Sequence, residues 1–336
     1  MKNASSTPRP SLWASLLQVV TFPLRGAVAT FSAFLILLVI FAGGFGYAWQ
    51  RWGGLVRNHP RYVVGPDQLV VTPRPEWVKA DVESEVLRDG GLSSLTLLDP
   101  QVTVKVARAF SLHCWVSEVR RVRKEYPSRL VVELEYRKPV AMVEVTTNGQ
   151  RGLLPVDGKG VLLPPQDFSA DQTADYVRIA VGETLPAGSP GTAWGDPEVA
   201  GAAAIAAALG NTWRAASVYR IASLPAPETS RGRMVEPQFA LLTRDGVQIV
   251  WGHAPGHEAG AEARAADKVA RLGKLVEQTG GRLPTTGTKS LDLRDPGGIT
   301  TGGPAAAPVS TGGAGSVFAP SGETLESDVP TGGEHP

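Results

Sequence analysis

The sequence predicts an α+β fold: one transmembrane helix near the N-terminus, a compact α+β module, a β-rich domain with flanking helices, and a disordered tail. Three observations predict this arrangement. They are a long uncharged apolar run, a strand–helix–helix–strand–strand pattern after it, and then many short strands separated by turns. The boundaries that these patterns suggest are 26–50, 60–138, 139–295 and 296–336. A chain of 336 residues has room for two or three domains.

The apolar run 26–50 has no charged residue, and Arg25 and Arg51 lie at its two ends. As an α-helix it would be about 37 Å long, which is enough to cross a bilayer with some tilt. Tyr47 and Trp49 lie where the aromatic belt of a membrane protein is found. A signal peptide is a poorer interpretation, because its apolar region is shorter and no A-x-A cleavage pattern follows. We therefore expect a single-pass protein in a lipid bilayer.

The charge pattern leaves the orientation of this helix open. Residues 1–25 are basic and contain no acidic residue. The basic residues close to the helix are Lys2, Arg9 and Arg25 before it, and Arg51, Arg57 and Arg61 after it. Because the two counts are equal, the positive-inside rule favours neither orientation. Residues 12–22 are apolar enough to form a short helix on the membrane surface, although a loose segment fits equally well.

The pattern from residue 60 to residue 138 predicts a compact α+β module. A short strand at 67–72 is followed by a helix from Pro75 to about residue 88, since proline is tolerated in the first helical turn. A second helix is expected from about residue 99 to residue 110. Apolar residues recur every four positions on one face of each helix: Val78, Val82, Val86, Val102, Val106 and Phe110.

Two strands, 116–124 and 129–137, close this module. The first is rich in basic residues, and the second alternates apolar residues with acidic and basic ones. Carboxylates on the neighbouring strand predict cross-strand ion pairs, so we interpret the basic residues as structural. The net charge of the chain is only +1, and we expect no nucleic-acid partner.

Short strands and turns dominate the region from residue 139 to residue 295. Strands are expected at 140–146, 153–156, 161–163, 176–181, 218–221, 238–243, 247–251 and 290–294. Asn148-Gly149 and Asp245-Gly246 are typical hairpin turns. Helices are expected at 197–209 and 258–278. The tail 296–336 has no lysine or arginine and is rich in glycine, a composition that predicts disorder.

The chain contains no motif of a known catalytic or cofactor-binding site. Ser-x-x-Lys, G-x-S-x-G, P-loop and G-x-G-x-x-G patterns are all absent from the sequence. His253 and His257 are four residues apart, but Pro255 and Gly256 would interrupt the helix needed to bring them together on a metal. The single cysteine, Cys114, excludes an intramolecular disulfide and a cysteine-based zinc site. We expect no catalytic residue, no cofactor, no metal and no small-molecule substrate.

Several short segments resemble, in order, the motifs of one protein family. Residues 126–130 and 137–141 are similar to a hairpin that closes a POTRA domain. Cys114-Trp115-Val116 resembles a Pro-Trp-Val motif, with cysteine in place of proline. Further similar segments are 155–161, 241–246, 250–252, 268–275 and 291–294. Together, over about residues 60–295, they resemble the bacterial cell-division protein family FtsQ, called DivIB in other lineages. Residues 183–237 and the tail depart from the pattern.

This resemblance implies a non-enzymatic scaffold that links early and late proteins of the division machinery at the septum. It implies a cytoplasmic segment at 1–25, a POTRA-like domain at 60–138 and an FtsQ-type β-domain at 139–295. The bulk of the chain would then lie outside the inner membrane. The implied partners are small coiled-coil membrane proteins similar to FtsB and FtsL.

Two other classes of protein remain as alternatives. A POTRA-bearing component of a membrane transport or secretion system would continue into a barrel of many amphipathic strands. In this chain, Ala-rich helical and low-complexity segments interrupt the strands instead. A cell-wall enzyme with an unrecognised site is the weaker alternative.

The last predicted strand is the candidate partner-binding site. A terminal strand followed by disorder is expected at a sheet edge, where unpaired N–H and C=O groups can bind a partner strand. The resemblance assigns this edge to the FtsB-like partner. The candidate residues are Leu291, Asp292, Leu293, Arg294, Asp295, Gly297, Gly298 and Ile299. We expect the two leucines to face the core, and Asp292 and Arg294 to face a partner. A purely structural last strand is the alternative.

Overall fold

The computed structural model describes residues 12–57, 62–92, 95–225, 236–281, 283 and 290–302. It has a mixed α+β fold with one long apolar helix near the N-terminus and a sheet-rich body. The chain divides into two compact units. One comprises residues 1–68, 94–102 and 124–129, and the other comprises residues 69–93, 103–123 and 130–336.

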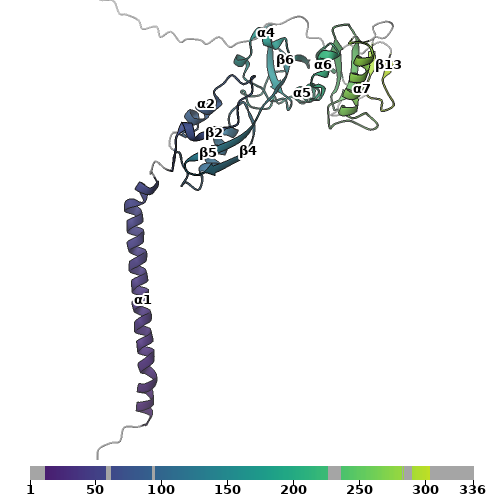
Figure 1. Cartoon of the computed structure of the whole chain (residues 1–336). Coiled ribbons are helices and arrows are strands. Elements are labelled where there is room, and N and C mark those ends of the chain that lie inside the picture. Colours follow the sequence, from purple (N-terminus) through teal and green to yellow (C-terminus); the bar gives the residue numbers. More distant parts are fainter. Residues whose placement is uncertain are drawn as a thin grey trace, which may run out of the picture. The chain divides into compact units, whose positions relative to one another are not determined.

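The first unit is dominated by helix α1, Leu12–Arg57 (Figure 1). Its segment Thr30–Gly53 is the one helix in the described part of the chain that is long and apolar enough to cross a membrane. The expected run 26–50 lies within α1 and overlaps this segment over residues 30–50. Its large apolar side chains are exposed, Phe41 to 74%. Residues 12–22 are helical as the first part of α1, not a loose segment.

A small two-stranded sheet completes the first unit. Strand β1, Val63–Val64, pairs antiparallel with strand β3, Leu95–Thr96. A short 3-10 helix, Pro66–Gln68, follows β1. Lys124 donates hydrogen bonds from Nζ to the carbonyl oxygens of Leu97 and Asp99, both at 2.7 Å. Lys124 therefore has a structural role, in agreement with the interpretation of the basic residues of this strand as structural.

A three-stranded sheet with order β2-β5-β4 forms the next part of the body. Its strands are β2, Leu69–Val71, β4, Val116–Glu125, and β5, Arg129–Tyr136; β2 runs parallel to β5. Two helices accompany it, α2, Val82–Asp89, and α3, Val102–Ser111. The six apolar helical positions predicted from the four-residue spacing are all buried: Val78, Val82, Val86, Val102, Val106 and Phe110.

Charge pairs across β4 and β5 confirm the cross-strand prediction. Arg120 Nη2 lies 2.7 Å from Glu135 Oε2, and Arg123 lies 3.9 Å from Glu133. Helix α2 is shorter than predicted. The expectation of a helix from Pro75 is wrong, because Asp81 caps the helix instead by accepting hydrogen bonds from the backbone N–H and the hydroxyl of Ser84.

The larger sheet has eight strands in the order β13-β12-β11-β10-β9-β8-β6-β7. The strands are β6, Pro139–Thr147, β7, Gln150–Asp157, β8, Val177–Ala180, β9, Val218–Leu224, β10, Gln238–Thr243, β11, Gln248–His253, β12, Ser290–Asp292, and β13, Thr300–Gly302. β8 lies parallel to β6 and to β9, and β12 lies parallel to β11; the other neighbours are antiparallel. The Asn148-Gly149 turn joins β6 to β7 with positive φ at both residues, as the hairpin prediction requires.

Helices pack beside this sheet (Figure 1). They are α4, Ala170–Thr173, α5, Pro197–Leu209, α6, Thr212–Ala215, and α7, Ala265–Gln278, with a 3-10 helix at Pro165–Asp167. α5 has a buried face that includes Val199, Ala202, Ile205 and Leu209, and its small side chains allow close approach to the sheet. An added Cβ at Gly201 would lie only 2.8 Å from Phe239 Cζ on β10. The Phe239 ring thus occupies space that the missing side chain of Gly201 leaves free.

Three other expectations need correction. The helix predicted at 258–278 begins only at Ala265, because Glu258 accepts a hydrogen bond from the Ala265 N–H and so ends the preceding loop. The strand predicted at 161–163 is absent, and Val161 and Leu162 form isolated bridges to Ala193 and Val156 instead. Disorder from residue 296 onward is wrong for Thr300–Gly302, which forms β13, while residues 303–336 lie outside the described residues. The predicted boundary between residues 138 and 139 stays a prediction.

The same glycine-to-alanine change should have opposite effects in α5 and α7. Gly201→Ala should lower the free energy of unfolding by about 1–3 kcal/mol, because the new methyl group overlaps the buried Phe239 ring. A Cβ added at Gly273 of α7 would have no atom within 4 Å. Gly273→Ala should therefore raise the free energy of unfolding by about 0.5–1 kcal/mol, because alanine has the higher helix propensity. Urea denaturation of the detergent-solubilised chain, followed by tryptophan fluorescence, measures both. Equal effects at the two positions would contradict the packing described here.

Candidate functional site

The predicted docking residues surround strand β12. β12 does not lie at the sheet edge as expected, because β13 pairs with it on the side away from β11. The edge of the described sheet is therefore β13, Thr300–Gly302. Register aligns Leu291 with Thr301 and Asp292 with Thr300. Residues 300–302 fold back on the strand that they follow, and the composition of this segment gave no sign of the pairing.

The apolar and polar residues of β12 point as the alternation predicts. Leu291 and Leu293 are buried in the core of the large sheet. Arg294 keeps 43% of its side-chain surface exposed and forms an ion pair with Asp292 at 2.6 Å. Burial raises the pKa of Asp292, but hydrogen bonds from Arg294 outweigh it and hold this pKa below its ordinary value. Asp292 and Arg294 therefore bind each other in the free protein.

Two side chains stabilise the turn between β12 and β13, one within the turn and one on α7. Asp295 Oδ1 accepts the Gly297 N–H at 2.7 Å, and Gly298 has a φ of +153°, which favours glycine. Arg271 of α7 donates to the carbonyl oxygens of Asp295, at 2.5 Å, and Pro296, at 2.7 Å. Ile299 packs against the hydrophobic core beyond the turn. The structure thus brings the predicted residues from 291 to 299 into one hairpin.

A buried charge cluster lies behind this hairpin. Glu262 accepts hydrogen bonds from Lys268 Nζ at 2.6 Å and from the His253 N–H at 2.9 Å, and its second oxygen lies 2.5 Å from His253 Nδ1. Lys268 is fully buried and stands 5.0 Å from the centre of the Trp251 ring. An added Cβ at Gly252 would collide with the Glu262 carboxylate and with Arg294 Cγ. The cluster therefore joins β11, α7 and the segment after β12.

The pKa of Glu262 is lowered in this environment. Burial by itself raises it, but hydrogen bonds from Lys268 and from the side chain and backbone of His253 lower it further than burial raises it. The sequence analysis missed this cluster. Its only signals were a lysine in the middle of an apolar helical face and a Trp-Gly-His run at a strand end.

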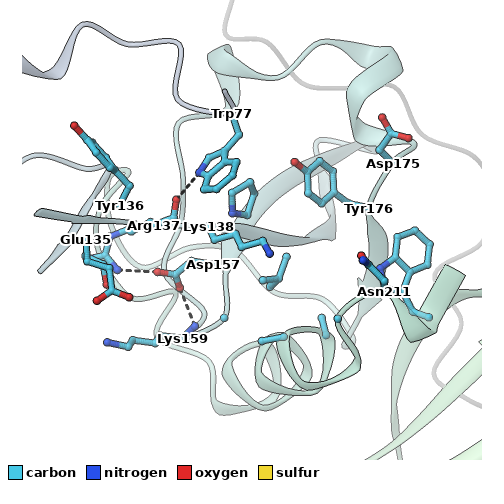
Figure 2. Close-up of a pocket in the computed structure, with 18 of the residues that line it drawn as sticks. Trp77, Glu135, Tyr136, Arg137, Lys138, Asp157, Lys159, Asp175, Tyr176 and Asn211 are labelled. Atoms are coloured by element: carbon cyan, nitrogen blue, oxygen red, sulfur yellow. Dashed lines mark hydrogen bonds and ion pairs between the residues drawn. The ribbon is translucent and has the colours of Figure 1, made fainter. Parts of the chain in front are cut away.

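A second feature is a cleft of about 550 Å³ in the body of the protein. Figure 2 shows Trp77 and Tyr176 on its two sides, with the Lys138 side chain reaching between them. Asn211 extends the lining beside Tyr176. The described lining contains no histidine or cysteine, so it offers ring faces and charged ends rather than a cysteine or histidine nucleophile.

Asp157 is the main support of this cleft. It accepts a hydrogen bond from Arg137 Nη1 at 2.7 Å and from the N–H groups of Lys159 and Val161, both at 2.9 Å. The carbonyl oxygen of Arg137 in turn accepts the Trp77 indole N–H at 3.0 Å (Figure 2). The charged side chains of Asp157 and Arg137 are both largely buried. One carboxylate thus fixes the β7 turn and the segment that joins β5 to β6.

No family model matches the chain, and no curated protein matches it either. A functional conclusion therefore depends on the residues of the chain itself.

The stability of the fold should depend on the ionisation of Glu262. Because its pKa is lowered by folding, the ionised carboxylate stabilises the folded state fully above the ordinary glutamate pKa of 4.5, and this contribution is lost as the pH falls toward the lowered value. Glu262→Gln should unfold at lower urea concentration at pH 7 and should lose part of the decline in stability that the unaltered protein shows as the pH falls below 4.5. Glu277→Gln, an exposed change on the same helix, is the control. A pH dependence identical to that of the unaltered protein in Glu262→Gln would contradict the assignment.

Removal of Asp157 should be far more harmful than removal of an exposed carboxylate. Asp157→Ala leaves the Arg137 guanidinium buried without its charge partner, which should cost about 3–5 kcal/mol of folding free energy. Asp175→Ala, in the same lining but exposed, should change it by under about 0.5 kcal/mol. Urea denaturation compares the two. Equal stability of the two variants would show that the ion pair does not hold the cleft.

Proposed function

We propose that the protein is a membrane-anchored scaffold of the FtsQ/DivIB type, which assembles division proteins at the septum through protein–protein contacts. Its N-terminus would be cytoplasmic and its bulk extracytoplasmic. Its partners would be FtsB-like and FtsL-like membrane proteins. The observation that supports this best is the hairpin at residues 290–302: a sheet ends in short strands whose outer edge faces away from the other strands.

Further features agree with this proposal. One apolar helix, Thr30–Gly53, precedes the folded body. Apart from the small β1–β3 sheet, the elements that follow are β2, α2, α3, β4 and β5, the order expected of a POTRA domain, and a sheet with flanking helices comes after them. The structure explains the glycine that ends the V-W-G segment at 250–252. Only glycine fits at position 252, because a Cβ there would collide with Glu262 and Arg294.

A sheet edge suits this role for a simple reason. Main-chain N–H and C=O groups at an edge can bind any extended segment, while side chains on one face set the register. Residues 290–294 offer that combination, since Leu291 and Leu293 anchor the strand in the core and the ion-paired Asp292 and Arg294 remain partly exposed. The buried cluster around Glu262 holds the supporting segments in place.

The alternative proposal, a POTRA-bearing component of a transport or secretion system, shares the same membrane helix and module. The large sheet argues against it, because among the described strands β7 and β13 are separate ends of an eight-stranded order rather than neighbours that close a barrel.

The orientation is testable by a fusion. A reporter enzyme that is active only outside the cytoplasm, joined after Pro336, should be active. A fluorescent protein that matures only in the cytoplasm should stay dark at the same position. The opposite pair of results would contradict the proposed topology and the family with it.

The docking edge is testable by site-specific photocrosslinking in cells. A crosslinking amino acid at exposed Asp295, in the turn between β12 and β13, should form a covalent adduct with the FtsB-like protein of the same organism. The same amino acid at exposed Arg151, on the opposite edge strand β7, should not. Adducts from Arg151 alone would place the partner at the other edge, and adducts from neither position would argue against the scaffold proposal.

A further inference from the structure

We propose that β13 is a displaceable strand that covers the docking edge of β12 and that a partner strand replaces. This inference rests on the proposed function and adds a means of regulating it. The protein would then capture its partner only when its own residues 300–302 leave the sheet.

The first argument is geometric. β12 has two edges, of which one pairs with β11 and the other with β13. A partner strand cannot hydrogen-bond to β12 while β13 occupies that second edge. Addition to the outside of β13 would use a three-residue Thr-Thr-Gly strand whose two threonines are exposed. Such a strand has no apolar side chain to fix the register of a partner.

The second argument concerns the strength of the pairing. Within the described residues, β13 makes three register pairs with β12, whereas the hairpin partners β6 and β7 make eight at the other end of the sheet. Fewer pairs mean fewer main-chain hydrogen bonds to exchange for those of a partner. A longer partner strand, paired along residues 290–294, would therefore replace β13 with a net gain of hydrogen bonds.

The third argument is that a side chain outside the strand holds the tail in place. Arg271 of α7 binds the carbonyl oxygens of Asp295 and Pro296, at the turn that directs the chain back along β12. Ile299 anchors the chain in the core just before β13. The turn can therefore remain fixed while residues 300–302 detach, so release of the edge does not require unfolding of β12.

The main experiment compares two truncations of the otherwise complete, membrane-extracted chain. One ends after Ile299 and lacks β13, and the other ends after Gly302 and keeps it. Capture of the coexpressed FtsB-like protein should be about three- to tenfold tighter without β13, because apparent affinity scales with the fraction of molecules whose edge is open. Binding is measured by titration on immobilised protein, with circular dichroism to confirm folding.

A substitution pair tests the role of the turn. Arg271→Gln removes the hydrogen bonds to Asp295 and Pro296 and should also tighten capture, because a turn without them no longer positions residues 300–302 for pairing with β12. Lys274→Gln, an exposed change on the same helix, should leave capture unchanged. Amide hydrogen exchange should be faster at Thr300 and Thr301 in Arg271→Gln than in Lys274→Gln.

A covalent lock gives the reverse test. Asp292 and Thr300 lie directly opposite each other, at the spacing that permits a cross-strand disulfide after both are changed to cysteine in a Cys114→Ser background. Capture by the oxidised form should be lost relative to the reduced form of the same variant, a comparison in which any direct contribution of Asp292 to binding cancels.

The outcomes separate the inference from the proposed function. Weaker or unchanged capture after removal of β13, or full capture by the locked form, would overturn displacement while leaving the scaffold proposal in place. Absence of capture by every form, including the intact chain, would remove the scaffold proposal and this inference together.

Discussion

The C-terminal half of the large sheet depends on the ion pairs and hydrogen bonds of the Glu262 carboxylate. It binds the backbone and ring of His253 at the end of β11 and the ammonium group of Lys268 on α7. A charge as deeply buried as Lys268 is tolerated only with such a partner. Because Gly252 leaves room for the carboxylate beside Arg294, the same group also sets where the chain can run after β12.

A second constraint comes from the edges of an open sheet. Every such sheet must end somewhere, and the outer strand then exposes unpaired main-chain groups. β7 and β13 are the two ends of the described order, and they differ in length. β7 pairs along its whole length with β6 in a tight hairpin, whereas β13 is described over three residues, Thr300–Gly302, that return along β12. This asymmetry favours the β13 end as the place where a strand of another protein can replace the protein's own strand β13.

The cleft beside β5 depends on another buried carboxylate, Asp157. It neutralises Arg137 and orders the β7 turn, and the same segment presents a carbonyl to Trp77. A further long-range bond, from the Trp115 indole N–H to Asp167 at 2.7 Å, links β4 to the 3-10 helix of the sheet region. These contacts join residues from the three-stranded sheet to residues from the eight-stranded one within one compact unit.

The sequence by itself determined the local elements of this protein, because periodicity reports directly which face of a helix or strand is apolar. The apolar run around α1, the valines of α2, the alternation along β5 and the Asn148-Gly149 turn were all predictable in this way. Only the tertiary structure decided where α7 begins, that Glu262 meets Lys268 and His253, and that residues 300–302 cover β12. These depend on how strands and loops approach each other in space, and neither residue spacing nor composition encodes that approach.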